Sequence, residues 1–182
     1  MRGITLAQLP LSAKVFCTLC FLGTGLGQLA AVTQAATAVG LSYDDVVASL
    51  SPEMPITHMA PGQTSGEREI DIGQLRSTAQ VWIRTPLLIQ TSHTHLFSQT
   101  LIAGLLGLIF LFSSLGEWKK AAILSLPFVG TIIDIGGMWL TRFIWQPFAV
   151  LVLVGGSLFA LGYLLISSIS LYELWVKKGA RI

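Results

Sequence analysis

Two histidines separated by one residue, His93 and His95, are the side chains in this sequence best suited to chemistry. Imidazole ligates haem iron or copper and titrates near neutral pH. On a helix, a spacing of two residues turns side chains about 200° apart. The pair therefore cannot easily bind one metal ion unless a helix begins between them, and each histidine is a separate candidate metal or cofactor ligand. The alternative is that the pair caps a helix and binds loop carbonyls.

Asp134 is a carboxylate within an apolar run, and an ionisable residue at such a position is a functional candidate by default. Two antiparallel helices should meet at a turn near Trp118, so residues equally far from this turn lie at the same depth. By this count we expect His95 to lie level with Arg142. The same count places Asp134 roughly 10 Å deeper, within about a turn of Gln99. Asp134 could relay a proton. Alternatively, it is a structural residue paired with Arg142 or Gln99.

We expect His93, His95 and Arg142 to share the outer rim of a helical bundle and to bind a cofactor there, either a quinone head group or a haem propionate. A haem held by two histidines needs one on each of two helices at similar depth, and only one apolar run supplies any. His58, a symmetry-related copy or another subunit would have to supply the second ligand. No cofactor is therefore assigned to this chain alone, and haem or quinone would be contacted together with partner subunits.

The remaining motifs do not indicate an enzyme. Cys17 and Cys20 lie inside an apolar run and share a helix face, which favours packing, with a redox or metal pair as the alternative. There is no CxxCH haem-attachment sequence, and no Walker, HExxH or GxSxG motif. We therefore expect no catalysis by this chain itself, although it could be a subunit of an oxidoreductase complex.

The composition is that of a membrane protein. The chain has 182 residues, of which 53% are apolar and 11% charged, whereas about a quarter of the residues of a soluble domain are charged. Its mean hydropathy is +0.72. The net charge of +2 is too small to suggest nucleic acid as a partner.

Four runs are long enough to cross a bilayer, for which about 20 apolar residues suffice. The fold class predicted is an all-α membrane protein with four transmembrane helices and an amphipathic outer-surface helix. We expect residues 1–38 to be an uncleaved signal anchor, 39–92 an extracytoplasmic loop, and 93–182 a three-helix bundle with a tail. The spans themselves are Lys14–Ala38, Leu96–Leu115, Ala121–Leu140 and Pro147–Leu171.

Basic residues near the helix ends predict the orientation, because cytoplasmic ends carry more of them. Seven lie on one side and four on the other, so both termini are predicted to be cytoplasmic in a bacterial inner membrane. Trp118 and Trp175 would mark the inner interface, and Trp139 and Trp145 the outer one. The seven are Arg2, Lys14, Lys119, Lys120, Lys177, Lys178 and Arg181; the four are Arg68, Arg76, Arg84 and Arg142.

The long loop contains two helix signals. Ser42 followed by Asp45 resembles a capping box and predicts a short helix. Ile72, Leu75, Ala79, Trp82 and Ile83 share one face of a second helix, which would end at Pro86 and lie on the membrane surface or dock onto a partner.

Small residues predict close helix packing, within the chain or with partner subunits. We also expect Pro127 to kink the third span. The small residues are Gly23, Gly27 and Ala31 in the first span, Gly136 and Gly137 beside Asp134 in the third, and Gly155, Gly156 and Gly162 in the fourth.

Several strings resemble a family of small four-helix bacterial inner-membrane proteins that are associated with respiratory c-type cytochromes. The resemblance covers the second to fourth spans and, more loosely, residues 41–46. It implies His93, His95, Asp134 and Arg142 as the distinctive polar positions. The relatives carry a cysteine–histidine haem motif before the second span, and this sequence lacks it. The strings are Ser-His-Thr-His-Leu-Phe-Ser (92–98), Pro-Phe (127–128), Asp-Ile-Gly-Gly-Met-Trp-Leu-Thr-Arg (134–142) and Ser-Leu-Tyr-Glu-Leu-Trp (170–175).

The expected function is that of an accessory subunit which anchors or stabilises a respiratory or photosynthetic electron-transfer complex. Its partners would be lipid, other membrane subunits and a periplasmic cytochrome-type protein. One rival is a cytochrome b-like or quinone-binding redox subunit. Another is a small copper-handling or transport protein that uses His93, His95 and Asp134.

These expectations give a first prediction. His95→Ala should reduce cofactor content or complex assembly more than Cys17→Ala, because only the first removes a ligand-type side chain. Cofactor absorbance and co-purifying subunits measure the difference. Equal and negligible effects of the two substitutions would remove the special role of the histidine.

Overall fold

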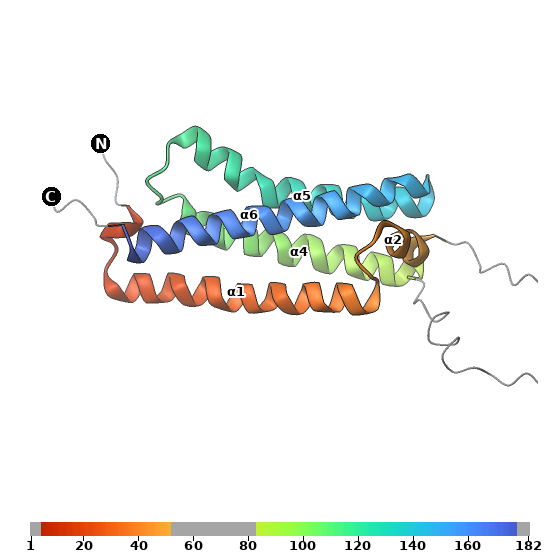
Figure 1. The fold of residues 1–182 in the computed structure, drawn as a ribbon, viewed down its shortest axis with the longest axis horizontal. Coiled ribbons are helices and arrows are strands. Elements are labelled where there is room, and N and C mark those ends of the chain that lie inside the picture. Colours follow the sequence, from red (N-terminus) through yellow and green to blue (C-terminus); the bar gives the residue numbers. More distant parts are fainter. Residues whose placement is uncertain (1–4, 52–82, 178–182) are drawn as a thin grey trace, which may run out of the picture.

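The structure is a computed structural model that describes residues 5–51 and 83–177, and its regular elements there are all helical. Four long helices lie side by side as a bundle (Figure 1). Each is long and apolar enough to cross a membrane, which confirms the predicted all-α fold with four transmembrane helices. They are α1 (Leu11–Ala38), α4 (Thr85–Phe110), α5 (Glu117–Phe143) and α6 (Ala149–Trp175), accompanied by the shorter α2 (Tyr43–Leu50), η1 (Leu6–Gln8) and η2 (Gln146–Phe148).

The second span lies further towards the N-terminus than predicted. Helix α4 begins at Thr85, not near Leu96, and the predicted residues 111–115 form the connection to α5. Pro86 lies in the first turn of α4, where a missing backbone N–H costs no hydrogen bond. It therefore starts this helix, residues 83 and 84 before it are not helical, and residues 85–92 of the predicted loop belong to α4.

Helices α5 and α6 form the closest pair, and glycines make their contact. A Cβ on Gly155 would lie 2.3 Å from the backbone nitrogen of Asp134, and one on Gly130 would lie 2.6 Å from that of Phe159. Gly137 and Gly162 are similarly close to the facing helix. On each helix the two glycines are seven residues apart, a spacing that keeps them on one face of paired helices. The backbones themselves are therefore in contact.

The other small residues are not part of this contact. A Cβ on Gly136 or Gly156 would meet nothing within 4 Å, so neither flattens the α5–α6 interface as predicted. Gly23 and Gly27 of α1 also face open space within the described structure. Pro127 lies inside α5, and the ribbon of α5 changes direction along its length, as the predicted kink requires (Figure 1).

Helix α1 is attached through its first half. Only Cys17 and Phe21 of its 28 residues are buried. The hydroxyl of Tyr163 in α6 donates to the carbonyl of Phe21 at 2.8 Å. The ammonium of Lys14 donates to the carbonyl of Leu174 at 2.7 Å. The start of α1 and the end of α6 therefore lie at the same end of the bundle (Figure 1).

The opposite end of the bundle is covered by α2. Its N-cap is Ser42, whose hydroxyl accepts from the backbone N–H of Asp45 in a complete capping box, which confirms the predicted short helix. Val46 and Leu50 of α2 are buried against Leu88 of α4. His58 and the predicted amphipathic helix, apart from its last residue Ile83, lie outside the described residues.

The glycine contact predicts a sharp difference between adjacent residues. Gly155→Ala should lower the free energy of unfolding by about 1–3 kcal/mol, because the new methyl group collides with the backbone of Asp134. Gly156→Ala is the matched control and should cost nothing, since it faces open space. Unfolding in mixed micelles, followed by circular dichroism, measures both. Equal stability of the two variants would contradict the close approach of α5 and α6.

Candidate functional site

One side of α4 faces the interior of the bundle. Most of this side is apolar, but the part between Leu88 and Ala103 carries polar side chains. Leu88, Ala103, Leu106 and Phe110 are buried apolar residues of this side. Between them, the same stripe carries Ser92, His95 and Gln99, three or four residues apart, as residues on one helix face must be. Helical periodicity therefore places these polar side chains opposite α5.

Asp134 of α5 lies against this polar stretch. The Nδ1 atom of His95 is 3.9 Å from the Oδ2 atom of Asp134, which is an ion-pair distance but too long for a hydrogen bond. The Asp134 side chain is 8% exposed and that of His95 is 41% exposed. His95 Nδ1 and Gln99 Oε1 are buried and have no hydrogen-bond partner within the described residues. A buried carboxylate thus sits behind a partly accessible imidazole.

The predicted depths were wrong. His95 was expected level with Arg142, and Asp134 deeper, but the structure places His95 beside Asp134. Ser92 of α4 contacts Trp139 of α5, and Thr85 of α4 contacts Arg142 of α5. In these antiparallel helices, residues at the same level are therefore equally far along the chain from residues 113–116. The predicted centre at Trp118 lies inside α5.

Arg142 is engaged elsewhere. Its guanidinium donates to the carbonyl of Leu50 at 2.9 Å and to the hydroxyl of Thr85 at 3.5 Å. It therefore joins the end of α2 to the start of α4, at the end of the bundle that α2 covers. The structure does not bring Arg142 together with His95, as the predicted rim site would require.

His93 occupies another face of α4. Its ring stacks on Phe97 with centroids 6.4 Å apart, and it borders a shallow surface groove with Leu96, Thr100 and Leu101. Because α4 already began at Thr85, the two histidines lie within continuous helix and point to different sides. Among the described residues, no group of three or more His, Cys, Asp or Glu side chains could hold one metal ion.

The cysteines lie in the hydrophobic core. Cys17 is a buried free thiol in a cluster with Leu6, Phe21 and Leu106, and Cys20 packs against that cluster. These contacts favour the packing interpretation, and a redox or metal role stays a prediction.

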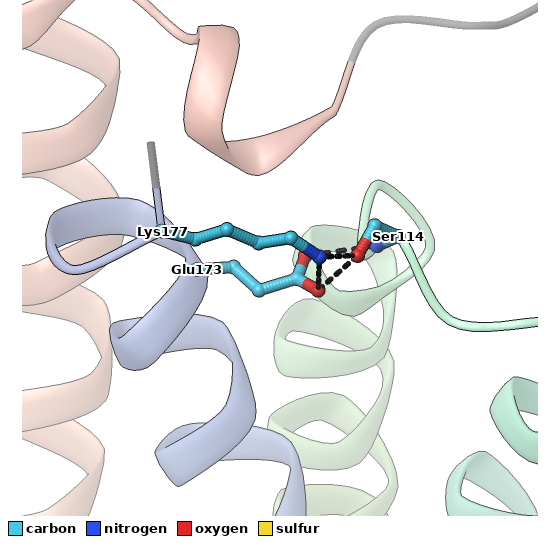
Figure 2. A network of polar contacts seen from close by, with 3 residues as sticks. All are labelled: Ser114, Glu173 and Lys177. Carbon is cyan, nitrogen blue, oxygen red and sulfur yellow. Dashed lines mark hydrogen bonds and ion pairs between the residues drawn. The ribbon is translucent and has the colours of Figure 1, made fainter. Parts of the chain in front are cut away.

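A second polar cluster, made of Ser114, Glu173 and Lys177, joins elements at the end of the bundle where α1 starts (Figure 2). Sequence reasoning used Lys177 only for the orientation and did not predict the cluster. Glu173 of α6 is 3% exposed, and it accepts hydrogen bonds from the backbone N–H of Ser114 at 2.8 Å and from the Ser114 hydroxyl. Lys177 donates to the same carboxylate at 3.2 Å and also to the Ser114 hydroxyl. The available signal was an acidic residue in an apolar helix with a lysine four residues later.

These contacts attach the connection between α4 and α5 to the last turn of α6. The N-terminal segment closes over the same region, because the backbone N–H of Leu6 donates to the carbonyl of Phe112 at 3.0 Å and the Leu6 side chain is fully buried. A buried carboxylate with these donors stabilises the fold and does not itself indicate chemistry.

Comparison with known proteins identifies the family. The model of a family described as a transmembrane helical domain, Aq_1264_TM, matches residues 85–181. The chain belongs to this family. The searches of curated proteins and of solved structures found no match to this chain. The match starts where α4 starts and includes α5 and α6, so the family unit contains His95, Asp134 and the Glu173 cluster.

The Glu173 cluster yields a stability prediction. Glu173→Ala should lower the free energy of unfolding by about 1–3 kcal/mol, because it removes the buried carboxylate that accepts hydrogen bonds from the Ser114 N–H and from Lys177. Glu117→Ala is the control, since that carboxylate is 89% exposed and its ion pair with Lys120 contributes less than about 1 kcal/mol. Denaturation in micelles compares the two variants. A larger loss for Glu117→Ala would refute the assigned role of Glu173.

Proposed function

We propose that this chain is an accessory integral-membrane subunit, not an enzyme by itself, which anchors or stabilises an electron-transfer complex. The observation that carries the proposal is His95, an imidazole with a 41% exposed side chain inside a membrane-spanning helix. A polar ring that faces lipid is costly unless a partner or cofactor covers it. A partner subunit or its cofactor is therefore expected on this side of α4.

The free faces of the bundle also support assembly with other helices. The outer half of α1, from Leu26 to Ala38, has no buried residue, and Gly23 and Gly27 leave room for a close neighbour. Small residues at such positions let helix backbones approach in a membrane. The chain would use this face, and that of His95, for contact with other subunits.

Electron transfer as the setting is supported by the resemblance of the second to fourth spans to proteins associated with c-type cytochromes, and by the chemistry of an accessible imidazole. The orientation in the membrane is supported by the positions of the lysines. Lys14, Lys120 and Lys177 lie at the end of the bundle where the described termini lie. This supports cytoplasmic termini and a bacterial inner membrane. A periplasmic cytochrome-type partner would then dock at the α2 end.

A second candidate is a redox-active subunit that itself binds haem or quinone. The position of Asp134 behind His95 favours it, because a carboxylate on one ring nitrogen orients the other nitrogen for a ligand. Copper handling through His93 and His95 has less support, since the two rings point to different sides of α4.

The test is purification of the tagged chain from its native membrane in mild detergent, with mass spectrometry of the co-purifying subunits and an optical spectrum of the same sample. Stoichiometric cytochrome or oxidoreductase subunits are expected, and His95→Ala should reduce their yield severalfold. His93→Ala, on the other face of α4, tests whether the effect is specific to the imidazole that faces Asp134 or common to both accessible imidazoles of this helix. A chain that purifies alone and colourless would overturn the electron-transfer proposal.

A further inference from the structure

We infer that His95 and Asp134 form a binding site for a quinone or quinol head group within the bilayer, with Nε2 of His95 as the contacting atom. Asp134 would be a positioning residue that acts through the imidazole. The inference deepens the proposed function, on which it rests, by naming the ligand class of the same site.

The first step is the orientation of the ring. Nδ1 of His95 is buried and faces the carboxylate of Asp134, yet the side chain as a whole is 41% exposed. The exposed part therefore belongs to the ring edge away from Nδ1, which carries Nε2. The buried nitrogen faces the protein and the other faces the surroundings.

The second step is the match in hydrogen bonding. A shortening of this 3.9 Å distance to roughly 2.8 Å on ligand binding would make the contact a charge-assisted hydrogen bond. With the proton on Nδ1 and held by the carboxylate, Nε2 accepts a hydrogen bond from a quinol hydroxyl. With the proton on the carboxyl group, Nε2–H donates to a quinone carbonyl. The pair can therefore bind both forms of the head group.

The third step is depth. His95 is ten residues into α4, which corresponds to about 15 Å along a helix of about 39 Å, so a hydrocarbon core of about 30 Å centred on α4 would include it. A ligand there must dissolve in the bilayer and still offer a hydrogen-bonding group, as an isoprenoid quinone does. A bis-histidine haem would instead need a second histidine, and His93 faces another side of α4.

The test uses the full chain, with its co-purifying subunits, in lipid nanodiscs. Short-chain ubiquinone and short-chain menaquinone are titrated, and quenching of tryptophan fluorescence is recorded. Trp139 is a built-in reporter, because its indole donates to Ser92, one turn from His95, at 2.8 Å. At least one of the quinones should quench saturably, and His95→Gln should weaken its binding about tenfold, as loss of one strong hydrogen bond implies.

His93→Gln is the matched control and should leave the affinity unchanged. Asp134→Asn should weaken binding and also change the tautomer ratio of His95, seen by nitrogen NMR of labelled imidazole; a merely structural role would not change this ratio. Circular dichroism checks the fold. If His95→Gln fails to fold, photo-crosslinking of an azidoquinone to the unaltered chain decides, with labelling around His95 expected.

Several results would overturn the inference. These are absence of saturable quenching by both quinones, equal affinities for the His95→Gln and His93→Gln variants, or crosslinks that avoid the His95 region. A Soret band that disappears in His95→Gln, without quinone binding, would reassign the site to haem. Such failures leave the accessory-subunit proposal intact if partner subunits still co-purify, so the two proposals are tested separately.

Discussion

Backbone contact between α5 and α6 is the constraint on which the rest of the bundle depends. Two glycines on each helix, seven residues apart, remove the side chains that would hold the helices apart. Between lipid-facing helices there is little hydrophobic driving force, so close packing of this kind supplies much of the association energy. Gly155 contacts the backbone of Asp134 directly, and the Asp134 carboxylate faces His95 of α4.

The remaining helices are attached to this pair by polar contacts at the two ends. Arg142 and Trp139 connect α5 to α2 and α4 at one end, and Glu173 and Lys177 connect α6 to the α4–α5 connection at the other. A hydrogen bond at the end of a span fixes the register of a helix that apolar contacts would let slide. The His95 site lies between these two ends, one helical turn from the contact of Ser92 with Trp139.

Much of the architecture followed from sequence, because the apolar length determines the spans and a local capping signal at Ser42 determines the start of α2. The depth of His95 did not follow. To predict this depth, one must know which residues form the centre of the connection between α4 and α5. Long-range contacts of Phe112 and Ser114 determine that position. The start of α4 was missed because Gln90, Ser92, His93 and His95 lower the local hydropathy, although they do not interrupt helical hydrogen bonding. The choice between Gly155 and Gly156 likewise required the facing helix.

The attachment of Lys14 to the carbonyl of Leu174 has a consequence for biogenesis. The two residues are 160 positions apart. At about 5–20 residues per second, synthesis of the intervening chain takes roughly 8–30 s. During that time α1 must reside in the bilayer without the partner that later holds it, which its run without charge after Lys14 permits. The end of α6 thus holds α1 in place, and this contact can form only after α6 has been synthesised.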